Sequence, residues 1–199
     1  MLFIYGASGH GKVILDCLNA SGKKVEGFID DDPEKTEFLN LPVFDSSKLE
    51  DKNVTVVYGI GNNATRRMLV EKYGNNTFIV LHPSAEVSPN SLVKEGTVIF
   101  HNAVVQSGTQ IGKHCIINTK ASVDHDCVLE DFVHISPGAI LCGDVNIGKG
   151  TWVGAGSVII QGVTIGRNVI VGAGSVIRKN VPDDVMVVGN PAKVMRKLK

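Results

Sequence analysis

An aliphatic residue stands at every sixth position over residues 87–177, and a small or β-branched residue stands two positions before each of them. A helix requires a period of about 3.6 residues and a plain amphipathic strand a period of 2, so neither alone accounts for this spacing. Short strands joined by turns, each with one aliphatic side chain pointing inward, do account for it. The aliphatic series is Val87, Val93, Ile99, Val105, Ile111, Ile117, Val123, Leu129, Ile135, Leu141, Ile147, Val153, Ile159, Ile165, Val171 and Ile177.

The sequence also contains a longer repeat made of three hexads. The heptapeptide VGAGSVI occurs at 153–159 and again at 171–177, an offset of eighteen residues or three hexads. Each coil should therefore have three faces, with residues eighteen apart stacked about 4.8 Å from one another. This is the hexapeptide pattern of a parallel β-helix. We predict this fold for residues 81–199, which include a C-terminal tail, with Gly and Asn at corners that need a positive φ.

Residues 1–80 contain no hexads and form a separate unit. The runs LFIYG, KVEGFIDDD, NVTVVYGIG and TFIVL predict four strands, and the segments after the first and third runs predict helices. Strands that alternate with helices indicate a parallel sheet. We predict a small α/β Rossmann-like domain over residues 1–80, joined to the β-helix domain of residues 81–199.

The first predicted strand leads into the glycine-rich segment GASGHGK, residues 6–12. Glycines allow close approach of a ligand, and a helix N-terminus favours phosphate. Asp30 lies 24 residues after Gly6, near the spacing expected of an acid that binds ribose. The glycines follow G-x-x-G-x-G rather than G-x-G-x-x-G, so a tight turn is an equal alternative, and Asp30 and Asp31 could simply begin a loop. The small size of the unit favours a nucleotide sugar over NAD.

The segment VDHDCVLEDFVHI, residues 123–135, places His125 beside Asp126 and puts His134 nearby. An imidazole can accept a proton at neutral pH because its pKa is near 6.5. A carboxylate beside it favours the imidazolium and raises that pKa. The pair is therefore a candidate general base.

The other four histidines are weaker candidates for a catalytic role. His101 and His114 have no acidic neighbour, so we place both on the surface. His82 precedes Pro83 at the predicted domain junction and should be structural. His10, in the glycine-rich segment, is a ligand contact or turn residue rather than a catalyst.

Composition excludes several classes of function. Lys+Arg and Asp+Glu both total 20, which argues against nucleic-acid binding and against an acidic-membrane anchor. The opening apolar run is too short for a signal peptide or a membrane span, so we expect a cytoplasmic location. No CxxC pair and no metal site is readable. Cys115 and Cys127 fall at small-residue positions of the repeat, where core packing is expected and a nucleophilic role for Cys127 is not.

Several segments together resemble one family. YGASGHGK, FIDDD, GIGNN, the unbroken hexads, SVDHDCVLEDFVHIS and VVGNPAK are similar to segments of bacterial N-acetyltransferases that act on UDP-4-amino-4,6-dideoxy sugars. These enzymes belong to the sialic acid O-acetyltransferase-like family of the hexapeptide-repeat acyltransferase superfamily. The resemblance covers nearly the whole chain. It implies a left-handed parallel β-helix, a homotrimer, and acetyl-CoA as cosubstrate without a metal.

The resemblance also implies roles for single residues. His125 would be the general base and Asp126 would raise its basicity, although the family often has Glu there. His134 and the backbone of Ala155 and Ala173 would contact acetyl-CoA. The residues implied to bind or shape the nucleotide-sugar site are Ser8, Gly9, His10, Asp30, Asp31, Gly61, Asn62 and Asn118. His125 and His134 are half a coil apart, so we infer that different chains contribute them to a site at a subunit interface.

The expected function is acetyl-CoA-dependent acetylation of the 4-amino group of a UDP-linked 4-amino-4,6-dideoxy sugar. Transfer would be direct, with a histidine base, in bacterial glycan biosynthesis. O-acetylation of sialic acid or a related sugar, and N-acetylation of a CMP-, GDP- or dTDP-linked acceptor, remain open. A nucleotide-sugar-binding scaffold without catalysis is a further alternative, against which the His–Asp pair and GNPAK argue.

Overall fold

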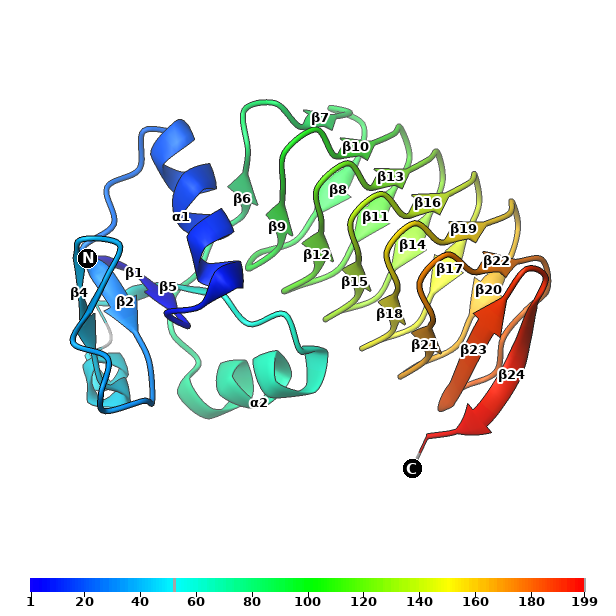
Figure 1. Ribbon diagram of the computed structural model, residues 1–199. Helices are drawn as coiled ribbons and strands as arrows, with labels where there is room; N and C mark the ends of the chain where they lie inside the picture. The colour runs from blue at the N-terminus through cyan, green and yellow to red at the C-terminus, as the bar shows by residue number, and fades with distance from the viewer. Residues whose placement is uncertain (52, 199) are drawn as a thin grey trace.

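A parallel β-helix follows a smaller α/β unit along the chain (Figure 1). The structure, a computed structural model, describes residues 1–51 and 53–198. In Figure 1 the chain climbs through the near face of the β-helix, crosses the top and descends at the back while it advances from left to right. That path is a left-handed coil, so the fold class expected from the hexads and the family resemblance is confirmed.

Each coil contributes one two-residue strand to each of three parallel faces. The first face contains β6 (Val80–Leu81), β9 (Val98–Ile99), β12 (Ile116–Ile117), β15 (His134–Ile135), β18 (Trp152–Val153) and β21 (Ile170–Val171). The second contains β7 (Glu86–Val87), β10 (Val104–Val105), β13 (Ser122–Val123), β16 (Ile140–Leu141), β19 (Val158–Ile159) and β22 (Val176–Ile177). The third contains β8 (Leu92–Val93), β11 (Gln110–Ile111), β14 (Val128–Leu129), β17 (Asn146–Ile147) and β20 (Thr164–Ile165).

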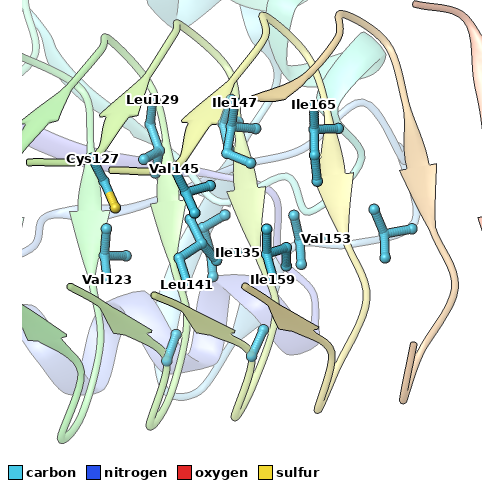
Figure 2. Close-up of a cluster of buried hydrophobic side chains, with 14 of the residues drawn as sticks. Val123, Cys127, Leu129, Ile135, Leu141, Val145, Ile147, Val153, Ile159 and Ile165 are labelled. Carbon is cyan, nitrogen blue, oxygen red and sulfur yellow. The ribbon is translucent and has the colours of Figure 1, made fainter. Parts of the chain in front are cut away.

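Residues paired on neighbouring strands of one face are eighteen positions apart in the sequence, as predicted. Val105 pairs with Val123 on the second face, and Ile117 pairs with Ile135 on the first. The predicted inward residues from Ile99 to Ile177 are buried and form one core, in which their side chains stack along the axis (Figure 2). Cys115 is fully buried within it, as its place in the repeat predicted. Burial of this column is the main favourable contribution to folding of the coil.

The corners of the coil repeat with the same period. Every sixth residue from Gly96 to Gly174 has a positive φ. Glycine adopts this left-handed region without a steric penalty, and Asn and Asp tolerate it better than other residues. Asp126 occupies one of these corners with a φ of 59°. The backbone conformation of this candidate site residue is therefore set by the repeat.

The N-terminal unit is a five-stranded sheet with the order β3-β4-β2-β1-β5. Its strands are β1 (Leu2–Tyr5), β2 (Gly27–Ile29), β3 (Glu37–Phe38), β4 (Leu41–Phe44) and β5 (Thr55–Tyr58). Its helices are α1 (Gly9–Ala20), α2 (Asn63–Tyr73) and the 3-10 helix η1 (Ser46–Glu50). The parallel pairing of β1 with β2 and β5 confirms three of the predicted strands.

The fourth predicted strand, TFIVL, was wrong as a member of this sheet. Its last two residues form β6, which pairs with β9 at the start of the β-helix. Val80 packs in one cluster with Ile14 of α1 and Ile116 of the β-helix, and this burial draws the run away from the sheet. The outer strands β3 and β4, which were not predicted, occupy the sheet edge beyond β2.

The C-terminal tail is an antiparallel hairpin of β23 (Val185–Gly189) and β24 (Ala192–Lys197). β23 pairs with β21 and so extends the first face of the β-helix, as the right-hand end of Figure 1 shows. Among the residues that the structure describes, no helix is both long enough and apolar enough to cross a membrane.

Candidate active site

An exposed histidine–aspartate pair occupies the corner between β13 and β14. His125 Nδ1 lies 2.9 Å from Asp126 Oδ2, and the two side chains are 61% and 68% exposed. A carboxylate accepts hydrogen bonds, so the ring proton belongs on Nδ1 and Nε2 keeps a lone pair. The hydrogen bond with Asp126 and the charge of Asp124 hold the pKa of His125 above its ordinary value. The pair is thus built to accept a proton at Nε2.

Asp126 reaches the ring although its side chain is one methylene shorter than that of Glu. Its backbone N–H donates to the carbonyl of Ser107 one coil earlier, at 3.1 Å. The carbonyl of His125 in turn accepts from the N–H of Asp144 one coil later, at 2.9 Å. Bonds to both neighbouring coils therefore fix the backbone that carries the pair.

The second histidine of the segment is buried and faces the N-terminal unit. His134 Nε2 lies 3.1 Å from Asn118 Nδ2, and Nδ1 lies 3.3 Å from the carbonyl oxygen of Gly61. Because that carbonyl can only accept, the proton belongs on Nδ1 and Nε2 accepts from the amide. The ring also stacks on Trp152, with centroids 5.7 Å apart. His134 thereby connects the β-helix to the loop before α2.

The glycine-rich loop combines tight packing with one open position. A Cβ on Gly11 would collide with the carbonyl of Gly6, and a Cβ on Gly6 would lie 2.9 Å from the carbonyl oxygen of Gly59. A Cβ on Gly9, in contrast, would meet none of the described atoms within 4 Å. Ser8 is the N-cap of α1 but its side chain makes no capping hydrogen bond. The first-turn N–H groups of α1 are therefore suited to an anion.

The two acids expected at the nucleotide-sugar site, Asp30 and Asp31, contact the protein itself. Asp30 Oδ2 accepts from the N–H of Ala7 at 2.8 Å and from Lys35 Nζ at 3.1 Å. Asp31 Oδ2 accepts from the hydroxyl of Tyr5 at 2.6 Å. Asp30 thus ties down the glycine-rich loop at the end of β2, which is the position predicted for it, while a contact with ribose stays a prediction.

His10 carries a buried nitrogen with no partner. Its ring meets Phe100 edge-on at 5.2 Å between centroids and lies 6.4 Å from the ring of His134. Within the described part of the chain, His10 Nε2 is buried and makes no hydrogen bond. An orphaned polar atom of this kind is rare in folded proteins. It marks the N-terminus of α1 as a place where a ligand could supply the missing bond.

Arg66 of α2 fastens the two parts of the chain together. It is 2% exposed, and its guanidinium donates to the carbonyls of Ile60, His114 and Phe132 at 2.8, 3.0 and 3.2 Å. A fourth bond reaches Asn63 Oδ1 at 2.8 Å. Burial lowers the pKa of Arg66 to about 10. The cation is held by neutral acceptors from α2, the loop before it and the β-helix.

The loop that precedes α2 also contributes polar contacts. Asn62 is the N-cap of α2, and its Oδ1 accepts from the N–H of Thr65 at 2.9 Å. Asn63 Nδ2 donates to the carbonyl of Gly150 in the β-helix at 3.0 Å. Capping accounts for Asn62 structurally, and its contact with a substrate remains a prediction.

Ala155 and Ala173 lie at a different corner from His125. Both are exposed, and they stack because β18 pairs with β21 eighteen residues later. The N–H of Gly174 donates to the carbonyl of Ala155 at 2.8 Å. This corner joins the first and second faces, whereas His125 lies between the second and third. One chain therefore groups His134 with Asn118, Gly61 and His10, and within the described residues no side-chain hydrogen bond or ring contact joins His125 to that group.

The prediction that His101 and His114 lie on the surface was wrong. His114 is buried, with its ring stacked on Phe132 at 5.4 Å, because it lies beneath the N-terminal unit. His101 is half-buried and stacks on His82 with centroids 3.7 Å apart. His82 Nδ1 also lies 2.7 Å from Ser84 Oγ, which fits the structural role expected of His82.

Comparison with known families matches both parts of the chain. Residues 1–73 match the PglD N-terminal domain, and residues 144–179 match the bacterial transferase hexapeptide (six repeats). The UDP-N-acetylbacillosamine N-acetyltransferase of Bacillus subtilis (strain 168) is 39% identical over 106 residues. That match spans about half of each protein, 48% of this chain and 49% of the relative.

Solved structures match nearly the whole chain. The acetyltransferase domain of PglB from Neisseria gonorrhoeae FA1090 is 37% identical, with a TM-score of 0.91 and coverage of 98% of both chains. This chain belongs to the hexapeptide-repeat sugar N-acetyltransferases. PerB from Caulobacter crescentus, solved with CoA and GDP-perosamine, is 36% identical with a TM-score of 0.93, over 98% of this chain and 97% of that one. The PglB domain has also been solved with acetyl coenzyme A.

Three buried histidines make the folded state of this acetyltransferase sensitive to acid. Burial, followed by the charge of Arg66, lowers the pKa of His10 and His114 to about 4 and that of His134 to about 3. Each titrates near 6.5 when unfolded, so between about pH 6.5 and 4 the unfolded chain binds more protons and the free energy of unfolding decreases as the pH falls. Each histidine should remove about 1 kcal/mol per pH unit in this window.

Thermal denaturation at several pH values measures this effect. We expect Tm to be nearly constant above about pH 7 and to fall progressively below about pH 6.5. Replacing His114 with Asn should make the fall shallower, because one titrating group is removed. A Tm that is the same at pH 7.5 and pH 5 would contradict the burial of these histidines in neutral form.

Proposed function

We propose that this chain transfers the acetyl group of acetyl-CoA to the 4-amino group of a UDP-linked 4-amino-4,6-dideoxy sugar, in the cytoplasm, during bacterial glycan biosynthesis. The observation that carries the proposal is the exposed His125–Asp126 pair, whose Nε2 is free to accept a proton. Two of the relatives named above carry a nucleotide-linked amino sugar in their printed descriptions, UDP-linked in one and GDP-linked in the other. The choice of UDP rests on the name of the Bacillus subtilis relative, and residues 1–73, which match the PglD N-terminal domain, would bind the nucleotide.

The chemistry is a direct acyl transfer. The amine nitrogen of the sugar attacks the thioester carbonyl, so that a C–N bond forms and, on collapse of the tetrahedral intermediate, the C–S bond breaks. His125 Nε2 takes the proton that the nitrogen must lose, and the imidazolium can return it to the departing CoA sulfur. Asp126 favours the imidazolium through its bond to Nδ1. General-base help of this kind is worth about 10²–10⁴-fold in rate.

Two fully buried cysteines are poor candidates for a covalent acetyl-enzyme, in line with direct transfer. Cys127 is fully buried, and burial raises the pKa of its thiol to about 11. Cys115 is also fully buried, and burial raises the pKa of its thiol to about 12. The thiolate is the nucleophilic form, so these two cysteines are poor acceptors of an acetyl group.

Two open features of the site suit the two substrates. The diphosphate would lie at the N-terminus of α1, against Ser8, Gly9 and the orphaned nitrogen of His10, with Gly61 nearby. Acetyl-CoA would lie along the stacked corner of Ala155 and Ala173, beside the face that carries His134. The remaining residues proposed for the nucleotide sugar are Asp30, Asp31, Asn62 and Asn118.

A homotrimer would bring these features together. His125 and the glycine-rich loop lie on different sides of one chain, so we propose that His125 of one subunit faces the nucleotide-sugar site of the next. A monomeric variant should then be inactive even when it is folded. Full activity of such a variant would exclude the shared site.

Release of CoA thiol measures the function with a panel of acceptors. The panel contains UDP-4-amino-4,6-dideoxy sugars, GDP-perosamine and free sialic acid, each with acetyl-CoA. We expect the highest kcat/KM with a UDP-amino sugar. Faster turnover of GDP-perosamine would mean that the substrate carries GDP rather than UDP. Turnover of sialic acid alone would mean that the enzyme is an O-acetyltransferase. No turnover of any acceptor, despite binding of acetyl-CoA, would exclude these acceptors as its substrate class.

Replacing Asp126 with Asn should shift the pH dependence of kcat/KM. Asn also tolerates the left-handed corner, but it removes the charge that holds the pKa of His125 above its ordinary value of about 6.5. A general base must be unprotonated, so the acid limb of the profile should move to lower pH and the plateau should fall. Profiles from about pH 5 to 9 measure the shift.

Asp184 provides the matched control for this variant. It is exposed, has a φ of 55° and lies in a later coil, so Asp184→Asn changes the same residue type in the same conformation away from His125. Its profile should match the wild type. An acid limb that stays in place in Asp126→Asn, or moves equally in both variants, would contradict the role of Asp126.

A further inference from the structure

The ring of His125 lies against a residue that has no side chain. Gly143 stands eighteen residues later and is therefore its neighbour on the next coil. A Cβ on Gly143 would lie 2.5 Å from His125 Nε2 and 3.1 Å from Cδ2, and closer still to Cε1. Real Cβ atoms do not approach other atoms to 2.5 Å. The imidazole thus occupies the space that any side chain at this position would take.

Backbone conformation does not explain this glycine. The left-handed corners fall at 126, 132, 138, 144 and so on, and Gly143 precedes one of them without a positive φ of its own. Its position in the hexad is occupied elsewhere by residues that all carry side chains. From residue 89 to residue 179 this series reads Pro, Glu, His, Ser, Lys, Thr, His, Asp, Pro, Gly, Lys, Ala, Gln, Arg, Ala, Lys. Gly143 is the one glycine in this series, and it occupies the position directly next to His125 on the following coil.

We propose that Gly143 is a positioning residue for acetyl transfer. Its bare backbone seats the imidazole so that Nδ1 meets Asp126, and it leaves the Nε2 edge accessible to the acceptor amine. A methyl group in that place would displace the ring, weaken the bond to Asp126 and obstruct the approach to Nε2. This inference rests on the proposed function, in which His125 is the base.

Gly143→Ala tests the proposal. Displacement of a catalytic group by about 1 Å can cost on the order of 10²-fold in rate, so we expect kcat to fall by about 10–100-fold while the KM for acetyl-CoA changes little. The acid limb of the pH profile should also move to lower pH, as in Asp126→Asn. An NMR titration of His125 in the intact protein should show its pKa falling toward the ordinary value even without substrate. Gln161→Ala, at the same hexad position one coil further on, should behave like the wild type.

A double-mutant cycle separates positioning from general damage. In the His125→Ala background, Gly143→Ala should cause no further loss, because there is no ring left to displace. An equal additional loss in that background would assign Gly143 to the structure of the coil and overturn the inference. So would Gly143→Ala with wild-type kcat and an unchanged His125 titration. His125→Ala with wild-type activity would instead defeat the proposed function itself.

Discussion

Replacing His125 with alanine should lower kcat by about 10²–10⁴-fold, the usual contribution of a general base. The side chain is 61% exposed, so its loss should leave the fold and Tm unchanged. The proton transfer contributes only in the transition state, so KM for both substrates should change little. Steady-state kinetics at about pH 8, where the wild-type imidazole is mostly unprotonated, measure the effect.

His101→Ala is the control for this variant. His101 is half-buried and stacks on His82, and in the described part of the chain its side chain makes no hydrogen bond or ring contact with the His125 corner. Its removal should leave kcat near the wild-type value. A loss of less than about 10-fold in His125→Ala, or equal losses in the two variants, would mean that another group accepts the proton.

Replacing Arg66 with methionine should destabilise the folded chain by about 3–5 kcal/mol. Methionine has a similar length but no donors, so the buried carbonyls of His114 and Phe132 and the part-buried carbonyl of Ile60 would lose their bonds. Each buried acceptor left unsatisfied costs about 1–3 kcal/mol, and relief of the buried charge offsets part of the sum. Denaturant unfolding of the whole chain measures the loss, monitored separately by Trp152 in the β-helix and by far-UV circular dichroism.

The adjacent arginine provides a close control. Arg67 is on the same helix but is exposed, and its ion pair with Glu71 joins Nε to Oε1 at 2.7 Å. Exposed pairs of this spacing contribute about 0.3–0.5 kcal/mol, so Arg67→Met should be nearly neutral. Equal effects of the two substitutions would show that Arg66 does not hold the two parts of the chain together.

The repeat made the β-helix predictable in detail. An inward position recurs every six residues, so a single register error would have moved polar side chains into the core. The structure instead buries the predicted series from Ile99 to Ile177. The contact between His125 and Asp126 could also be predicted, because the two residues are adjacent and the corner conformation of Asp126 is part of the same repeat.

Contacts between the two parts of the chain were not predictable in the same way. Arg66 lies in the polar segment NNATRRMLVEKYG, where a charge is expected to face solvent, and only the packing of α2 on the β-helix buries it. The one available signal was its spacing of three residues from Leu69, which places both on one helix face. His114 was missed for the same reason, since its burial depends on a surface that local sequence does not reveal.

The contacts of the candidate site that join distant parts of the chain were likewise not predictable from local sequence. Asn118 and Gly61 meet His134 from distant parts of the chain, and the sequence related these three residues only through the family resemblance. Gly143 could have been noticed as the single glycine in its hexad series. Its meaning required the position of the His125 ring, which depends on the stacking of one coil on the next.

One incubation tests the central claim most directly. The wild-type protein and His125→Ala would each be incubated with acetyl-CoA and a UDP-4-amino-4,6-dideoxy sugar, and the product analysed by mass spectrometry and NMR. We predict that the wild type adds one acetyl group to the 4-amino nitrogen, with an equal amount of CoA thiol released, and that the variant forms almost none. Acetyl on a sugar oxygen, or equal product from both proteins, would contradict the proposed reaction and its base.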